Sequence, residues 1–104
     1  MSVARDSWAY REVAVHSVPD ARTGRLRIAP MPGQAFAPSM RVQCARALSD
    51  PAQYPPGTRF LLNAKLTDRL GGEPFLFAWH GDPVQVLSAA AARKFLKAFR
   101  RGRI

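Results

Sequence analysis

Residues 58–79, TRFLLNAKLTDRL-GG-EPFLFAW, decide the fold, because they contain the strongest hairpin signal in the chain. Two runs of alternating apolar residues flank Gly71 and Gly72. Paired glycines suit a tight hairpin turn, whose central residues need positive φ angles. The stretch therefore predicts two antiparallel strands joined at this glycine pair.

The length of this turn decides which side chains of the two strands share a face. A two-residue turn pairs Leu66 with Phe77 and Ala64 with Trp79, so the aromatic side chains join the core. We expect this pairing. A three-residue turn would move the aromatic side chains to the basic face, where they could stack on bases of a single strand. The aromatic side chains are Phe75, Phe77 and Trp79, and the basic face holds Lys65, Thr67 and Arg69.

Short alternating segments on both sides of the hairpin predict further strands. They cover 10–18, 25–29, 40–48 and 84–87, of which 40–48 also fits a short helix. Turn-forming segments separate them, at 19–24, 30–40, 49–57 and 80–83. We expect a mostly β fold, with α+β as the alternative. Residues 1–104 would form one domain, a small open SH3-like or OB-like barrel of five to six short antiparallel strands.

The last part of the chain predicts a basic amphipathic helix over 88–101 that packs on the barrel. Ser88 is a suitable N-cap residue. Four apolar residues recur at helical spacing and form one stripe, and basic residues fill the rest of the surface. The stripe consists of Ala92, Phe95, Leu96 and Phe99.

The charge of the chain favours a polyanionic partner. Sixteen Lys and Arg residues against seven Asp and Glu give a net charge of +9 over 104 residues. We expect a protein that binds DNA or RNA through phosphates, without strong sequence preference. The candidate contacts are Arg25, Arg27, Arg59, Asn63, Lys65 and Arg69 on the strands, and Arg93, Lys94, Lys97, Arg100, Arg101 and Arg103 in the C-terminal segment.

The alternative function is protein–protein interaction, by an SH3-like module or a homodimeric subunit of a larger assembly. Leu61 and Leu76 are its candidate contacts, because the hairpin pattern leaves both on the outer face. Paired exposed leucines there would serve a protein partner better than a nucleic acid.

Catalysis and metal binding have little support in the sequence. The only histidines, His16 and His80, are far apart, and no zinc-protease, nucleophile-elbow or phosphate-loop motif occurs. We therefore expect no enzyme, no cofactor and no metal. The single cysteine, Cys44, excludes an internal disulfide and is expected to be a buried small apolar residue.

Membrane association is not expected either. No apolar run approaches the roughly 20 residues that a transmembrane helix needs. Asp6 and Glu12 interrupt the N-terminal segment where a signal peptide would be continuously apolar. We expect a cytoplasmic protein without a membrane partner.

Overall fold

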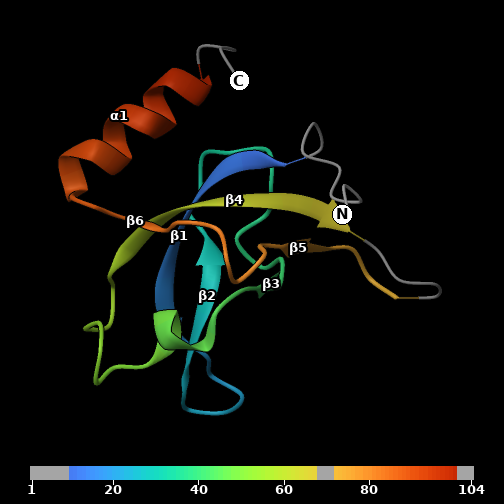
Figure 1. Ribbon diagram of the computed structural model, residues 1–104, viewed down its shortest axis with the longest axis vertical. Coiled ribbons are helices and arrows are strands. Elements are labelled where there is room, and N and C mark those ends of the chain that lie inside the picture. Colours follow the sequence, from blue (N-terminus) through green and yellow to red (C-terminus); the bar gives the residue numbers. More distant parts are fainter. Residues whose placement is uncertain (1–9, 68–71, 101–104) are drawn as a thin grey trace.

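The computed structural model describes residues 10–67 and 72–100, which form one curved sheet, a short 3-10 helix and a C-terminal α-helix (Figure 1). The elements are β1 (Arg11–Pro19), β2 (Leu26–Pro30), β3 (Val42–Gln43), η2 (Arg46–Ser49), β4 (Arg59–Thr67), β5 (Phe75–Phe77), β6 (Gln85–Leu87) and α1 (Ala89–Arg100). The sheet has the order β2-β1-β4-β5-β3, and β6 also pairs with β4. The prediction of a mostly β fold with a C-terminal helix is confirmed. The six strands form an open sheet whose ends are β2 and β3.

Strand β4 organises the sheet because its two halves have different partners. Its first half pairs with β6 and its second half with β5, while β1 runs antiparallel along the other edge. The prediction of antiparallel strands throughout is wrong at one place, because β3 and β5 are parallel. The chain reverses direction between β3 and β4 and again between β4 and β5, so β3 and β5 point the same way.

The segment predicted as a strand over 40–48 is divided between two conformations. Only Val42 and Gln43 form a strand, and the 3-10 helix η2 follows. Leu48 in η2 is 4% exposed and belongs to the core, so this short helix closes one end of the inner face. Both alternatives for this segment were therefore correct in part.

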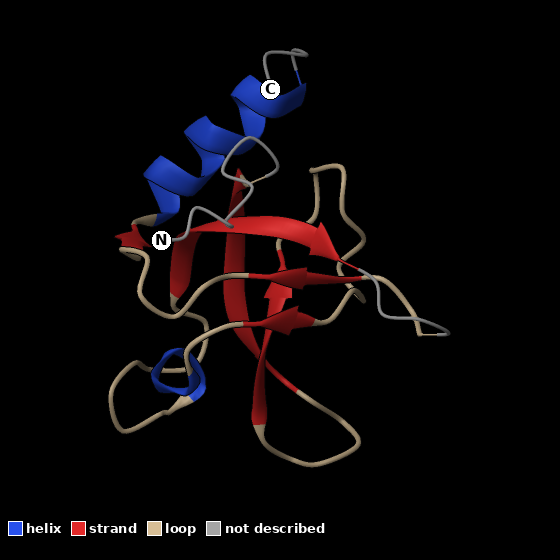
Figure 2. Ribbon diagram, turned by 45° about the vertical axis from the view of Figure 1, so that its right-hand side comes forward, coloured by secondary structure: helices blue, strands red, loops and turns tan. Residues whose placement is uncertain are grey.

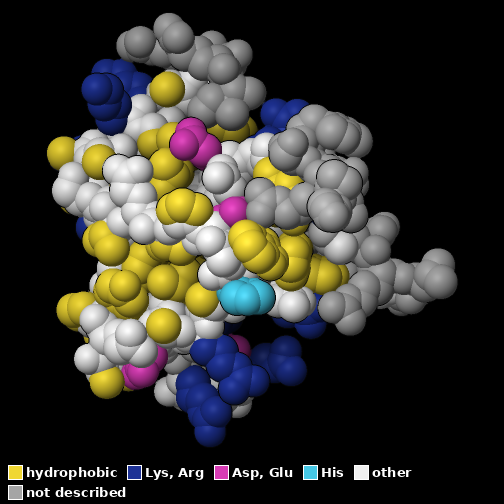
Figure 3. Space-filling view, viewed as in Figure 1, with side chains coloured by type: hydrophobic (Ala, Val, Ile, Leu, Met, Phe, Trp, Pro, Cys, Tyr) yellow, Lys and Arg dark blue, Asp and Glu magenta, His cyan; other side chains and the backbone are white. Residues whose placement is uncertain are grey.

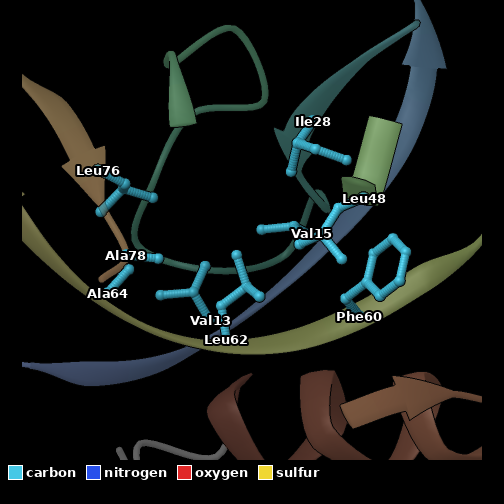
Figure 4. Packing of buried hydrophobic residues seen from close by; sticks show 9 residues of the cluster. All are labelled: Val13, Val15, Ile28, Leu48, Phe60, Leu62, Ala64, Leu76 and Ala78. Atoms are coloured by element: carbon cyan, nitrogen blue, oxygen red, sulfur yellow. The ribbon is translucent and has the colours of Figure 1, made fainter. Parts of the chain in front are cut away.

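The concave face of the sheet holds the main hydrophobic core (Figure 4). Val13 and Val15 from β1 lie opposite Leu62 and Phe60 from β4, as the register of these strands requires. Tyr54 packs its ring edge against Phe60, with the ring centroids 5.0 Å apart. The buried members of this core are Val13, Val15, Ile28, Leu48, Phe60, Leu62, Ala64, Leu76 and Ala78.

Helix α1 lies on the opposite, outer face of the sheet, as Figure 2 shows. The backbone N–H of Ala91 donates to the Ser88 hydroxyl at 3.0 Å, which confirms Ser88 as the N-cap. Ala92 is 1% exposed and packs with Ala14 and Leu87, which forms a second, smaller core. Helix α1 therefore contacts the sheet through this second core.

The register of the β4–β5 hairpin corrects the prediction of a two-residue turn. Lys65 pairs with Phe77 and Leu66 with Leu76, which is the pairing of the three-residue alternative. The turn itself, 68–71, lies outside the described residues. The core explains the outcome, because Ala64 and Ala78 lie close together there (Figure 4). A shift by one residue would place a tryptophan in this narrow space.

Candidate nucleic-acid interface

On the face seen in Figure 3, basic side chains gather at opposite ends of the molecule. In the view of Figure 3, Lys and Arg atoms cluster over the β1–β2 hairpin at the bottom and over α1 at the top. Hydrophobic side chains occupy much of the face between them. On this face, the cations over the β1–β2 hairpin are therefore separated from those over α1.

The first region is an arginine seam where the two ends of the open sheet, β2 and β3, approach each other. Two adjoining grooves of about 870 Å³ and 530 Å³ follow this boundary. Arg27 from β2 and Arg41 beside β3 line both grooves. Asp20 and Glu73 are the acidic residues in the lining of the larger groove. We define the arginine seam as Arg22, Arg27, Arg41 and Arg46.

Contacts within the protein hold two of these guanidinium groups in place. Arg27 donates from Nη2 to the backbone oxygen of Pro38 at 3.3 Å. The Arg41 guanidinium carbon lies 4.9 Å from the centroid of the Phe75 ring, in a cation–π arrangement. Each contact uses only part of the guanidinium, so donors remain for an anionic group such as phosphate.

Positive charge extends from the seam along the outer face of the sheet. His16 pairs across β1 and β4 with the half-buried Arg59. Partial burial lowers the pKa of His16 below its ordinary value of 6.5, and the guanidinium groups of Arg59 and Arg27 lower it further. The imidazole therefore lies in a region of excess positive charge.

The second basic region lies on α1. Arg93, Lys94 and Lys97 are exposed and line a groove of about 560 Å³. The other side of the groove is formed by Pro32 and Gly33, in the loop after β2. Here three cations on one helix could contact a phosphate backbone.

A third region is the part of the outer face that belongs to β4 and β5. Lys65 and Phe77 share this face because they are paired across the two strands, and both are half-buried. The Lys65 ammonium lies 5.8 Å from the centroid of the Tyr10 ring. Trp79 is 43% exposed, and Asn63 is exposed. The shift in register thus brings aromatic and cationic side chains together.

Only part of the predicted aromatic stripe is accessible. Phe75 is 2% exposed and carries Arg41 over its ring, so its role as a stacking residue is contradicted. Phe77 is half-buried, and Trp79 presents the largest accessible ring of the three.

The structure brings together some predicted site residues and adds others. Arg25 is exposed in the turn between β1 and β2, close in sequence to Arg22 and Arg27. Arg69, Arg101 and Arg103 lie outside the described residues, and Arg100 ends α1. Sequence analysis missed the seam residues Arg22, Arg41 and Arg46. They flank short or irregular segments, and no alternation pattern could have joined them.

The predicted leucine pair for a protein partner is wrong. Leu76 is 0% exposed in the inner core, whereas Leu61 is half-buried against α1 on the outer face. The register explains this, because Leu76 pairs with Leu66 and therefore points to the face opposite Leu61.

The remaining candidate groups include Cys44 and the possible metal ligands within 10–67 and 72–100. Burial raises the pKa of the Cys44 thiol to about 11, so it stays protonated at neutral pH. No three His, Cys, Asp or Glu side chains of the described residues come together as metal ligands. In the same part of the chain, no helix has both the length and the apolar character needed to cross a membrane.

Comparisons of the chain with protein-family models, with curated proteins and with solved structures gave no match.

Proposed function

We propose that this protein binds nucleic acid, DNA or RNA, through phosphate contacts and without strong sequence preference. The arginine seam carries the proposal. Four arginine residues from the β1–β2 hairpin, β2 and both flanks of β3 contribute to the lining of two adjoining grooves, three to each groove. Arginine offers a planar set of donors that matches phosphate geometry, and clustering raises the local positive potential.

The net charge of +9 supports the same proposal. Each cation that neutralises a phosphate releases condensed counterions, so binding should weaken steeply with salt. The cations of α1 would provide a second set of phosphate contacts. We also propose that the open sheet is a small barrel of the SH3-like or OB-like kind, and that the protein acts in the cytoplasm. An open barrel of this kind offers a curved strand surface on which a nucleic-acid chain can lie.

The test is fluorescence anisotropy with labelled single-stranded DNA, single-stranded RNA and duplex DNA, each over a series of salt concentrations. We expect the double variant Arg27→Ala/Arg41→Ala to bind more weakly. The slope of log K against log salt should become less negative by about 0.7 to 0.9 for each phosphate that the variant no longer neutralises. Arg11→Ala is the control for loss of charge, compared per charge removed, because Arg11 is exposed at the far end of β1 from the seam.

Two results would contradict the proposal. One is no binding of any nucleic acid by the unmodified protein at low salt. The other is an equal loss of binding free energy per charge removed in the seam variant and in Arg11→Ala, which would indicate a general effect of net charge rather than a site.

The helix contribution needs a separate variant. Arg93→Gln/Lys94→Gln/Lys97→Gln removes three exposed cations of α1 and keeps its apolar contacts. If the helix contacts phosphate, this variant should also reduce the salt dependence. An unchanged slope would restrict the interface to the sheet.

A protein-interaction module is the alternative from another class. The leucine pair no longer supports it, but Leu66 and Val86 expose more than half of their surface. A homodimer formed through such side chains would show in the molar mass measured by light scattering. A monomer at all concentrations would leave the nucleic-acid proposal as the simpler explanation of the charge.

A further inference from the structure

We infer that Trp79 is a base-stacking site and that it gives the protein a preference for single-stranded nucleic acid. This inference deepens the proposed function and rests on it. It starts from the direction of the side chain. Ala78 is 7% exposed and packs in the inner core, so the next residue along the extended chain points to the outer face. The 43% exposure of Trp79 agrees with this direction.

The indole ring rests on a glycine that leaves room for it. A Cβ atom added at Gly81 would lie 2.5 to 2.8 Å from three carbons of the Trp79 six-membered ring. Any other residue at position 81 would push the ring away. Gly81 is not among the glycines with positive φ, so its backbone does not demand a glycine. The absence of a side chain at this position serves the placement of the indole.

A tight turn holds this arrangement together. The backbone N–H of Asp82 donates to the Trp79 oxygen at 3.0 Å. The exposed His80 ring lies beside the indole, with centroids 5.6 Å apart and planes inclined by 53°. An exposed indole that is already held by its neighbours loses less conformational freedom when a base stacks on it.

Cationic and polar groups lie along the same face of the sheet. Phe77, two residues before Trp79, pairs with Lys65 on β4. Trp79 follows the end of β5 by two residues, so a chain whose base stacks on the indole would pass near Lys65. Asn63 is exposed on β4, two residues before Lys65. Stacking rings flanked by groups that contact the backbone are the arrangement used by proteins that bind single strands.

The chemistry of the ring selects single strands over duplexes. Bases in a duplex stack on each other and are paired, so an aromatic ring on a sheet surface cannot reach their faces. Bases of a single strand expose their faces, and every base offers one regardless of sequence. Trp79 therefore contributes to binding of single strands only, whereas the arginine seam contributes to both forms.

The experiment measures the affinities for an oligothymidine of about twelve nucleotides and for a duplex of the same length, in the full chain. Trp79→Leu removes the aromatic face and keeps apolar bulk, and Gly81→Ala keeps the indole but displaces it. Val84→Ala is the control, because Val84 is an exposed apolar residue shortly after the turn. We expect both test variants to lose about 5-fold or more in affinity for the single strand. Affinity for the duplex, and all affinities of the control, should stay the same.

The salt dependence separates this inference from the proposed function. Stacking is not electrostatic, so Trp79→Leu should lower affinity without changing the salt slope, in contrast to the seam variant. An unchanged ratio of single-strand to duplex affinity in both variants would overturn the inference and leave the proposed function standing. Absence of all binding by the unmodified protein would overturn both. Circular dichroism would show whether each variant is folded, and Gly81→Ala provides the test if Trp79→Leu is not.

Discussion

The outer face of the sheet has two halves that differ in what covers them. In one half, Ala14 and Leu87 are covered by α1 and form a second core. The other half consists of the end of β4, β5 and the residues that follow β5. The cluster that α1 packs against includes none of its residues, and Trp79 is 43% exposed there. Both halves carry large apolar side chains, so hydrophobicity alone does not distinguish them.

The difference lies in which residues accompany the apolar ones. The covered half has small or aliphatic side chains that allow a helix to approach closely. In the open half, Phe77 and Trp79 lie among Lys65 and Asn63. Burying these charged and polar side chains beneath a helix would cost desolvation free energy. The first half therefore contributes stability, and the second is the surface on which we propose that the ligand binds.

The largest effect on stability should come from the covered half. Leu87 is 6% exposed on β6, and Leu87→Ala should lower the free energy of unfolding by about 2–5 kcal/mol. Its neighbour Val86 is 54% exposed, so Val86→Ala should change it by about 0.5 kcal/mol or less. Urea unfolding measures both. Equal losses would show that α1 and β6 do not form a separate core.

The contact between α1 and the sheet can be tested by enlarging one side chain. Ala92→Leu adds volume at a position that is 1% exposed and should cost about 1–3 kcal/mol. Ala90→Leu makes the same change at an exposed position of the same helix and should be nearly neutral. If Ala92→Leu were also neutral, the helix would not be packed where we place it.

Removal of the helix N-cap should have a smaller effect. Ser88→Ala leaves the N–H of Ala91 without its 3.0 Å hydrogen bond and should cost about 1 kcal/mol. Ser88→Asp, which also caps helices well, should retain the stability. Thermal unfolding of the unmodified protein, Ser88→Ala and Ser88→Asp measures these differences. A Ser88→Ala variant as stable as the unmodified protein would argue against the cap.

The smallest effect should be a dependence of stability on pH. The pKa of His16 is lowered in the folded protein, so the unfolded chain binds a proton more readily. The contribution of His16 should be fully present above pH 6.5 and should be lost as the pH falls from there through the folded-state pKa. His16→Gln should remove this component from urea unfolding curves recorded between about pH 7.5 and pH 5. A component that persists in the variant must come from another group.

The sequence predicted the elements well and their relations less well. Alternation located β1, β2, β4 and β5, and the N-cap and apolar stripe located α1, because these signals are local. The register of β4 and β5 depends on a one-residue difference in turn length, and alternation fits both choices. Of the predicted stacking residues, Phe75 is therefore buried and Trp79 is exposed.

The arginine seam lay beyond sequence analysis for a different reason. Arg22 and Arg41 are nineteen positions apart in sequence, and only the curvature of the sheet brings the ends β2 and β3 together around them. Charge counting predicted that a basic surface should exist, but it could not separate the seam from the cations of α1. Such a surface depends on tertiary contacts, which no single-sequence pattern records.

The most direct test of the open half as the ligand surface is an NMR titration of the ¹⁵N-labelled protein with a short oligothymidine. We expect the largest chemical-shift changes at Trp79, at Lys65 and along the arginine seam. The amides beneath α1, such as Ala14 and Leu87, should change little. Shifts confined to the exposed face of α1, with Trp79 unaffected, would contradict the proposed interface and would place it on the helix.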